Sequence, residues 1–348
     1  MEERGSQIHV ASWGADEAQH VPFAVSNDLL SAPPALRERM HRDGYLYLRG
    51  LLDPALLGEL RADILGVCAQ HGWLQPDRAV LDGIASGPPR VEGEDAYCAV
   101  YDDVQHLERF HALKHHPLIS EVMGHLFDSP LVVHPLAVCR LMFPNFADYA
   151  TPPHQDHPNN RGSTETYAMW IPVTTCPRSL GPIAVIEGSH RYGVLPMRSA
   201  LGAGYRTVVP RPDLEALRWV SGDFAAGDVL IFHSLTVHRS LANRSADRLR
   251  VSVDYRFQGL GDPISEFVLR PHFNRLAWDD IYRTWQSSEW RYYWRDLPLC
   301  IVPHETPAAD PPPPDATQPA DAGTAPAAGR AGWLQRVRGR LLPSPRAS

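Results

Sequence analysis

Apolar residues recur at helical spacing in the first third of the chain. The clearest case is the segment 54–70, in which leucine, isoleucine and valine return every three or four positions. Asp53 can cap a helix N-terminus, and Pro54 and Gly72 stand where helices often begin and end. A helix is therefore predicted over 54–70. A short strand is predicted before it at 44–50, and two short helices after it at 105–115 and 117–127.

From residue 130 the apolar positions alternate with a period of two, which is the pattern of half-buried strands. Turn residues separate short runs of this kind at 131–143, 165–174, 182–187, 228–233 and 249–258. A succession of short strands favours an antiparallel barrel or sandwich, so the fold is predicted to be mainly β with a core at about 130–258. The stretch at 75–104 is rich in Gly, Pro and Asp and has no period, so we interpret it as a covering loop region.

Two segments follow the predicted strands. Residues 276–294 carry four Trp and three Tyr, too many for a solvated helix, so we expect a helix that packs outside the barrel. Residues 305–329 are mostly Pro and Ala, without large apolar side chains that could offset the entropy of ordering. The sequence therefore predicts a single domain over 1–304 and a disordered Pro/Ala-rich tail over 305–348 with a basic C-terminal end.

Composition narrows the classes of protein that fit. The chain has 44% apolar residues and nine Trp, which is the balance of a globular protein. Its formal charge of -7 gives no general field for a nucleic-acid backbone, and no apolar run approaches the length of a membrane span. The N-terminus lacks the pattern of a secretory leader, and the five cysteines are far apart, so a reducing cytoplasm is expected.

A histidine and an aspartate stand two positions apart in the phrase TPPHQDHP. Residues at this spacing face the same way on an extended strand, so His154 and Asp156 can reach one metal ion. Far downstream, the phrase GDVLIFHSLTVHRS offers His238 on a second candidate strand, with His233 as the alternative. Two imidazoles and one carboxylate leave three positions of an octahedral ion open, which is the arrangement of non-haem Fe(II) oxygenases.

The predicted strand at 249–258 has an unusually polar face. Val251 and Val253 alternate with polar residues, which are Arg250, Ser252, Asp254 and Arg256. A polar strand face is unexpected in an ordinary core and is expected in a barrel that encloses a charged ligand.

These phrases resemble the Fe(II)- and 2-oxoglutarate-dependent oxygenases of the phytanoyl-CoA dioxygenase family. The resemblance covers about 40–300 and is densest in PHQDH, TYAMWIPVTTCPRSLGPIAVIEGSHRYGVLP and GDVLIFHSLTVHRSLANRSADRLRVSVDYRFQ. It implies a double-stranded β-helix, a jelly-roll or cupin-like barrel with flanking N- and C-terminal helices. It also implies Fe(II), 2-oxoglutarate and dioxygen, with His154, Asp156 and His238 as the catalytic metal ligands.

The same resemblance implies a 2-oxoglutarate site. Arg250 matches the arginine that pairs with the far carboxylate of 2-oxoglutarate, and Arg248, with the same strand parity, is the alternative. Ser240 matches a hydroxyl that shares this carboxylate. Trp170 falls at an aromatic position beside the cosubstrate, and Cys139 is expected to line the same pocket from the preceding strand.

The chain departs from the family pattern in two loops. Glu187 replaces the proline of the usual PGSH turn, and the loop between Asn243 and Arg250 is one residue longer than is common. Neither change touches an expected ligand, so both bear on loop geometry more than on chemistry.

The expected function is hydroxylation of a small organic molecule, with release of succinate and carbon dioxide. Desaturation or ring formation is the alternative within this chemistry, and a non-catalytic cupin-like binding module is the alternative outside it. The pocket walls are expected from the variable-looking loops at 75–104, 144–153, 157–165 and 191–222, which carry no readable substrate code. We expect neither nucleic acid nor a membrane as a partner, and the sequence predicts no oligomeric state.

Overall fold

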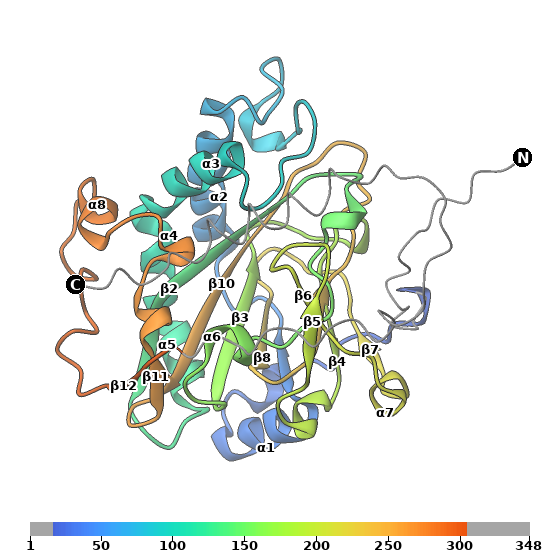
Figure 1. Cartoon of the computed structure of the whole chain (residues 1–348), viewed down its shortest axis with the longest axis vertical. Helices are drawn as coiled ribbons and strands as arrows, with labels where there is room; N and C mark the ends of the chain where they lie inside the picture. The colour runs from blue at the N-terminus through green and yellow to red at the C-terminus, as the bar shows by residue number, and fades with distance from the viewer. Residues whose placement is uncertain (1–16, 305–348) are drawn as a thin grey trace, which may run out of the picture.

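Two antiparallel sheets face each other at the centre of the computed structural model, which describes residues 17–304 (Figure 1). The larger sheet has the order β1 (Tyr45–Leu48), β8 (Val229–His233), β3 (Thr166–Pro172), β10 (Arg250–Gly259) and β2 (Leu131–Met142). The smaller sheet has the order β7 (Trp219–Val220), β4 (Ile183–Ile186) and β9 (His238–Ser240). Trp170, Phe232 and Val185 belong to one buried cluster between the sheets, as expected for a double-stranded β-helix.

Helices cover the outer face of the larger sheet. They are α1 (Pro33–Asp43), α2 (Pro54–Gln70), α3 (Asp95–Gln105), α4 (Glu108–Ala112) and α5 (Pro117–Gly124). Leucines of α1 and α2 share one apolar cluster with the odd-numbered residues Val251 and Val253 of β10. The alternation predicted for β10 therefore separates an apolar outer face under the helices from a polar inner face.

Shorter elements complete the described part of the chain. The strands are β5 (Met197–Ser199), β6 (Arg206–Val208), β11 (Pro263–Ser265) and β12 (Cys300–Val302), and the helices are α6 (His157–Asn160), α7 (Pro212–Glu215) and α8 (Trp278–Tyr282). β5 and β6 pair as a hairpin, whereas β11 and β12 pair in parallel. No helix within residues 17–304 is long and apolar enough to span a bilayer.

The strand predictions are confirmed within a few residues, and the helix at 54–70 is confirmed with Asp53 Oδ1 accepting a hydrogen bond from the Ala55 amide at 2.8 Å. The jelly-roll prediction is also confirmed, although helix (32%) exceeds strand (24%), so the protein is mixed rather than mainly β by content. Two local predictions are wrong. The segment 75–104 contains all of α3 except its last residue, and the segment 276–294 is helical only in α8.

The reason for the short α8 lies in a competing acceptor. Glu108 accepts hydrogen bonds from the backbone amides of Gln286 and Ser287, at 2.7 and 2.9 Å, so these amides are not available to continue a helix. The aromatic segment still packs outside the barrel as predicted, with the Tyr293 hydroxyl donating to the Val133 carbonyl of β2. The predicted tail at 305–348 lies outside the described residues.

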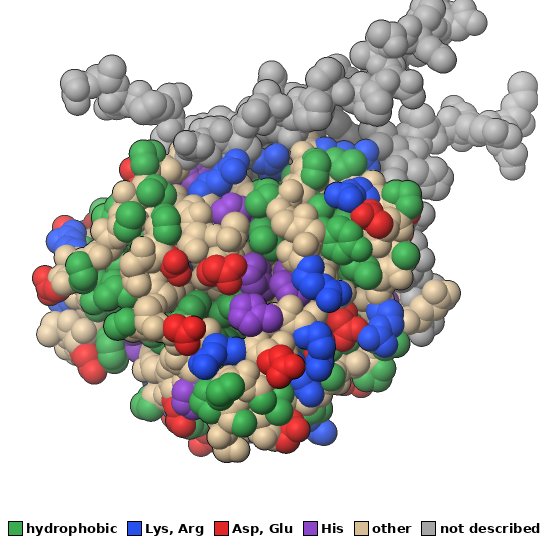
Figure 2. Space-filling model, turned by 90° about the horizontal axis from the view of Figure 1, so that it is seen from below, with side chains coloured by type: hydrophobic (Ala, Val, Ile, Leu, Met, Phe, Trp, Pro, Cys, Tyr) green, Lys and Arg blue, Asp and Glu red, His purple; other side chains and the backbone are tan. Residues whose placement is uncertain are grey.

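Histidine side chains gather near the centre of the face seen from below, on the side of α1 (Figure 2). At this end of the protein, His190 Nε2 donates to the carbonyl of the exposed His41 at 2.9 Å, and the His190 and His233 rings lie 5.3 Å apart. His233 also has Nε2 3.4 Å from Glu165 Oε1. His233 therefore already contacts His190 and Glu165, away from the inner face of β10.

Candidate active site

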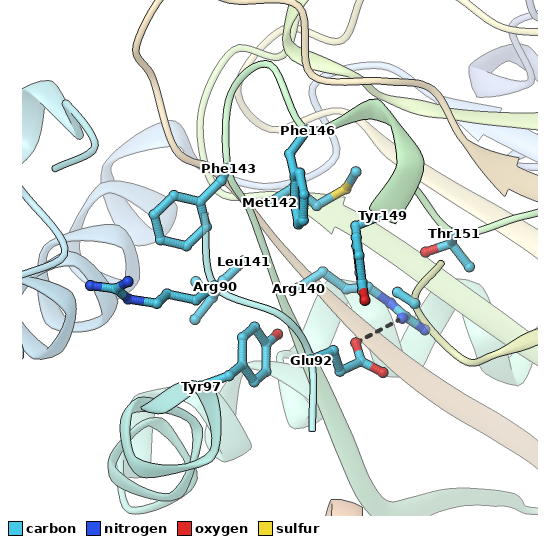
Figure 3. Close-up of a pocket in the computed structure, with 11 residues that line it drawn as sticks. Arg90, Glu92, Tyr97, Arg140, Leu141, Met142, Phe143, Phe146, Tyr149 and Thr151 are labelled. Atoms are coloured by element: carbon cyan, nitrogen blue, oxygen red, sulfur yellow. Dashed lines mark ion pairs between the residues drawn. The ribbon is translucent and has the colours of Figure 1, made fainter. Parts of the chain in front are cut away.

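A pocket opens at the edge of the larger sheet beside β2 (Figure 3). Its space is about 30 Å³, enough for water but not for an organic substrate. The lining side chains are Arg90, Glu92, Tyr97, Arg140, Leu141, Met142, Phe143, Phe146, Tyr149, Thr151 and Ala203. The four residues from 140 to 143 come from the end of β2 and the position just after it, and the others come from three of the four loop regions expected to form the walls; the region 157–165 contributes none.

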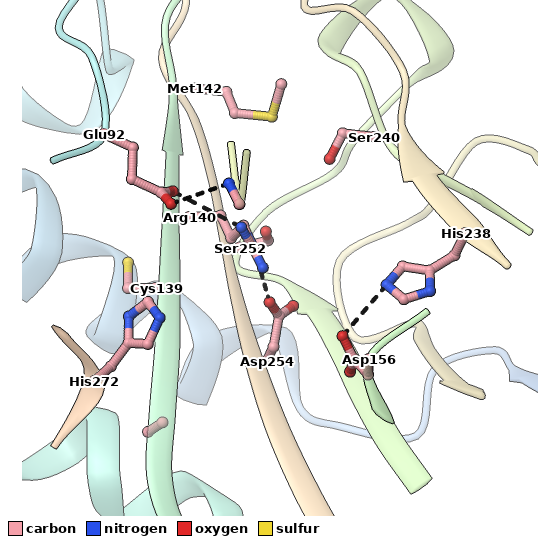
Figure 4. Close-up of polar contacts among 12 residues, drawn as sticks. Glu92, Cys139, Arg140, Met142, Asp156, His238, Ser240, Ser252, Asp254 and His272 are labelled. Carbon is pink, nitrogen blue, oxygen red and sulfur yellow. Dashed lines mark hydrogen bonds and ion pairs between the residues drawn. The ribbon is translucent and has the colours of Figure 1, made fainter. Parts of the chain in front are cut away.

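A charged network that the sequence did not reveal joins this pocket to the inner face of β10 (Figure 4). Arg140 of β2 donates from Nε to Asp254 Oδ2 at 3.1 Å, and its Nη1 lies 3.8 Å from a carboxylate oxygen of Glu92. Arg140 and Asp254 share an inner face because Ser252 is the cross-strand partner of Arg140. Strand alternation identifies Arg140 only once the register of β2 against β10 is known.

The three predicted metal ligands come together in the barrel. His154 pairs with His238 through two backbone hydrogen bonds of 2.9 Å, which places both rings side by side. Asp156 Oδ1 lies 3.7 Å from Nε2 of each histidine, and all three side chains are buried. One ligand atom from each residue lies within 4.8 Å of the others, and theirs is the one group of three found among the described residues.

Backbone contacts orient both imidazoles. Nδ1 of His154 donates to the Pro152 carbonyl, and Nδ1 of His238 donates to the Thr236 carbonyl, each at 2.9 Å. Burial, with the neighbouring His238, lowers the pKa of His154 to about 3, and burial also lowers the pKa of His238. Both rings are thus neutral at pH 7 and point an unprotonated Nε2 at the common centre, which is the form that binds a metal.

Arg256 holds the third ligand. Its Nε and Nη2 donate to Asp156 Oδ2 at 3.2 and 3.0 Å, which leaves Oδ1 facing the histidines. Burial alone would raise the pKa of Asp156, but the guanidinium of Arg256, with that of Arg140, outweighs it and holds the pKa below its usual range. Two neutral nitrogens and one charged oxygen around a single point fit Fe(II) with open positions.

Arg250 lies further along the inner face of β10. It is 1% exposed, its Nη2 donates to Ser240 Oγ at 3.1 Å, and its Nη1 donates to Ser252 Oγ. The guanidinium lies 5.9 Å from the Trp170 ring. Within residues 17–304 it has no ion pair with a carboxylate, so a buried positive charge is left for an anionic ligand.

The structure thus brings Arg250, Ser240 and Trp170 together, whereas the alternative Arg248 is exposed. The expectation for Cys139 is wrong. Cys139 pairs with Val253, so its side chain points to the outer face of the sheet and lies in the apolar cluster under the helices. The β2 residues on the inner face at this level are Arg140 and Met142, which pair with Ser252 and Arg250 of β10.

Known proteins resemble this chain over most of its folded part. Two curated relatives are 1-deoxypentalenic acid 11-beta-hydroxylases. The one from Streptomyces arenae is 29% identical over 252 residues, covering 68% of this chain and 84% of its own length. The one from Streptomyces exfoliatus is 27% identical over 251 residues, covering 67% and 85%. A solved structure of the epimerase SnoN with Fe3+, alpha ketoglutarate and nogalamycin RO aligns at 23% identity and a TM-score of 0.49, covering 67% of this chain and 86% of that one.

A match to a protein-family model assigns the chain to a family. The model described as Phytanoyl-CoA dioxygenase matches residues 40–251, which is more than half of the chain and includes the His-Asp-His group and Arg250. The chain therefore belongs to the phytanoyl-CoA dioxygenase family and is an Fe(II)- and 2-oxoglutarate-dependent dioxygenase.

Proposed function

We propose that this dioxygenase hydroxylates a small organic molecule with Fe(II) held by His154, Asp156 and His238, and with 2-oxoglutarate held by Arg250 and Ser240. One observation carries the proposal. Asp156 Oδ1 lies 3.7 Å from the unprotonated Nε2 atoms of His154 and His238, beside the buried Arg250, which has no acidic partner within residues 17–304. The reaction consumes dioxygen and 2-oxoglutarate, inserts one oxygen atom into a substrate C–H bond, and releases succinate and carbon dioxide.

Each side chain has a distinct part in this proposal. The bound iron supplies the activation of dioxygen, and the protein supplies its geometry. Arg250 offers a planar fork to the far carboxylate of 2-oxoglutarate, a geometry that a lysine does not match. Ser240 lies within hydrogen-bond distance of the same guanidinium and can donate to the same carboxylate. Trp170, 3% exposed, closes the inner side of this space and keeps water out.

The names of the relatives support hydroxylation over desaturation or ring formation, because both are called hydroxylases. A complete ligand group and family membership support an enzyme over a non-catalytic binding module. We also propose that the catalytic domain ends near residue 304. A cytoplasmic location stays a prediction, in keeping with five cysteines that form no disulfide.

The experiment that tests the proposal loads the protein anaerobically with Fe(II) and 2-oxoglutarate and follows the iron charge-transfer band. Oxygen is then admitted with candidate small molecules, and mass spectrometry follows a gain of one oxygen coupled to succinate. His238→Ala should lose the band and turnover, whereas the matched His233→Ala should keep both. A dead His233→Ala beside an active His238→Ala with normal iron content would show that the assigned ligand is wrong.

A further inference from the structure

The pocket beside β2 lies directly against the proposed catalytic centre. Met142 lines the pocket, and its sulfur contacts Arg250 Nη2. Arg140 also lines the pocket and is close enough to Asp156 to contribute to its lowered pKa. A molecule that enters this pocket therefore meets Arg140 next to the metal ligands, so the groups around Arg140 decide which substrate chemistry is accepted.

The three arginines on the inner face each have an anionic partner, either in the structure or in the proposed function. Arg256 is paired with Asp156, and Arg250 is the proposed partner of 2-oxoglutarate. Arg140 is shared by two acids, Asp254 at 3.1 Å and Glu92 at 3.8 Å. Among the described residues of this face, none of these three arginines is therefore left to receive a carboxylate from the substrate.

Two further observations support this charge count. Arg90 also lines the pocket, but its guanidinium is directed away from Arg140 and Glu92 (Figure 3). Burial raises the pKa of Glu92, with Arg140 acting in the opposite direction. We take Glu92 as ionised beside Arg140, 3.8 Å away, so that the group of Arg140, Asp254 and Glu92 has one net negative charge and repels an anion.

The same group has an unused acceptor. Asp254 is 4% exposed, and within the described residues its Oδ1 has no hydrogen-bond partner. Asp254 stands on the inner face of β10 between Arg250 and Arg256, and its carboxylate lies between Arg140 and Asp156 (Figure 4). A buried carboxylate oxygen requires a donor, and a substrate hydroxyl is a donor that an ionised carboxylic acid lacks.

The remaining walls favour flat rings. Four of the lining side chains are aromatic, and Phe146 and Tyr149 stack with ring centres 4.5 Å apart. Glu92 joins the loop before α3 to the loop between β5 and β6: its side chain accepts from the Gly204 amide at 3.3 Å, and its carbonyl accepts from the Tyr205 hydroxyl. Because the present space holds only water, we expect these two loops to separate when a ring compound enters.

We infer that the substrate is an uncharged ring compound bearing a hydroxyl group, which donates toward Asp254, and that Glu92 and Asp254 together reject carboxylic acids. This inference rests on the proposed function, because it takes Arg250 as already committed to 2-oxoglutarate. It separates this chain from its relatives, whose names specify an acid as the substrate.

A pair of matched probes tests the inference without needing turnover. Equilibrium dialysis of the anaerobic Fe(II)/2-oxoglutarate protein measures binding of a series of ring alcohols, starting with 2-naphthol, against the corresponding acids, starting with 2-naphthoic acid. The alcohols should bind at least about tenfold more tightly than the acids, because the acids meet like charge. Glu92→Gln keeps the acceptor for Gly204 and removes the charge, so it should strengthen binding of the acids about tenfold and leave the alcohols unchanged.

Glu94→Gln is the control, since it makes the same change of charge two positions away, outside the pocket lining. Acids that bind as tightly as alcohols to the unmodified protein would overturn the inference. So would a series in which no alcohol binds, or a Glu92→Gln variant with the same preference as Glu94→Gln. The iron charge-transfer band, recorded before any probe is added, reports separately on the proposed function: its absence counts against the iron and 2-oxoglutarate assignment rather than against the substrate class.

Discussion

Arg256→Gln tests whether Arg256 keeps Asp156 charged and oriented before metal arrives. The substitution removes two hydrogen bonds, of 3.0 and 3.2 Å, from a carboxylate whose side chain is 6% exposed. Removing one partner of a buried ion pair costs about 3 to 5 kcal/mol, because the other charge is left uncompensated. Arg140 remains and also favours the charged form of Asp156, so we take the lower value, about 3 kcal/mol, for the metal-free protein at pH 7.

The assay is thermal unfolding in the presence of a chelator. At about 2 to 4 °C per kcal/mol for a domain of this size, the melting temperature of Arg256→Gln should fall by about 6 to 12 °C. The melting temperature of Arg256→Lys should fall by less, because lysine keeps the positive charge and can still donate one hydrogen bond to Asp156. Arg248→Gln removes the same charge from an exposed position nearby and should change stability by no more than about 0.5 kcal/mol.

The pH dependence gives the sign of the effect. In the unmodified protein the pKa of Asp156 is held below its unfolded value, so this carboxylate contributes stability that is present above the unfolded pKa and is lost as the pH falls through the folded pKa. Without Arg256, burial raises the folded pKa, and below that raised pKa the carboxyl is protonated and no longer an uncompensated charge. The difference between the two proteins should therefore narrow as the pH falls. A gap that widens, or one equal to that of Arg248→Gln, would refute the reasoning.

Three further predictions concern the cofactors and the tail. Arg250→Lys should weaken 2-oxoglutarate about 10- to 150-fold, for a loss of roughly 1.5 to 3 kcal/mol, and Ser240→Ala should weaken it less; anaerobic titration of the charge-transfer band measures both, and unchanged affinity would transfer the role to Arg248. Fe(II) at about 100 times its dissociation constant should stabilise the protein by about 2.7 kcal/mol in chelator-free unfolding, and His238→Ala should abolish this gain. Truncation after residue 304 should leave succinate formation intact, and a drop in melting temperature beyond about 4 °C, or more than about 1 kcal/mol, would show that the removed segment packs on the domain.

Local patterns predicted the convergence of His154, Asp156 and His238 because the signals are short. The spacing of His154 and Asp156 and the alternation around Arg250 depend on neighbours along the chain, and both survive folding. The side chains of His154 and Asp156 do converge, but the extended strand predicted for them is wrong. His154 forms an isolated bridge with His238, and Asp156 has a helical backbone conformation at the start of α6.

Features that depend on distant pairing were not predictable from the sequence. β2 is buried on both faces over most of its length, so its alternation does not show which side faces the cosubstrate. This is why Cys139 was placed on the wrong face and Arg140 was missed. Likewise, Glu92 comes from a loop without any period, and only its approach to Arg140 gives it a role in the pocket.

The inner face of β10 has a consequence for redesigning the enzyme. The rise of a strand, about 7 Å for every second residue, sets the spacing between Arg250, Asp254 and Arg256. β10 is paired with β2 on one side and with β3 on the other. A slip of one residue would turn all of them toward the helices, and neither neighbour allows β10 to slip alone. Libraries that aim at new substrates should therefore leave β10 unchanged and vary the loops around Glu92 and Gly204, where insertions alter the pocket without disturbing the spacing between cosubstrate and metal.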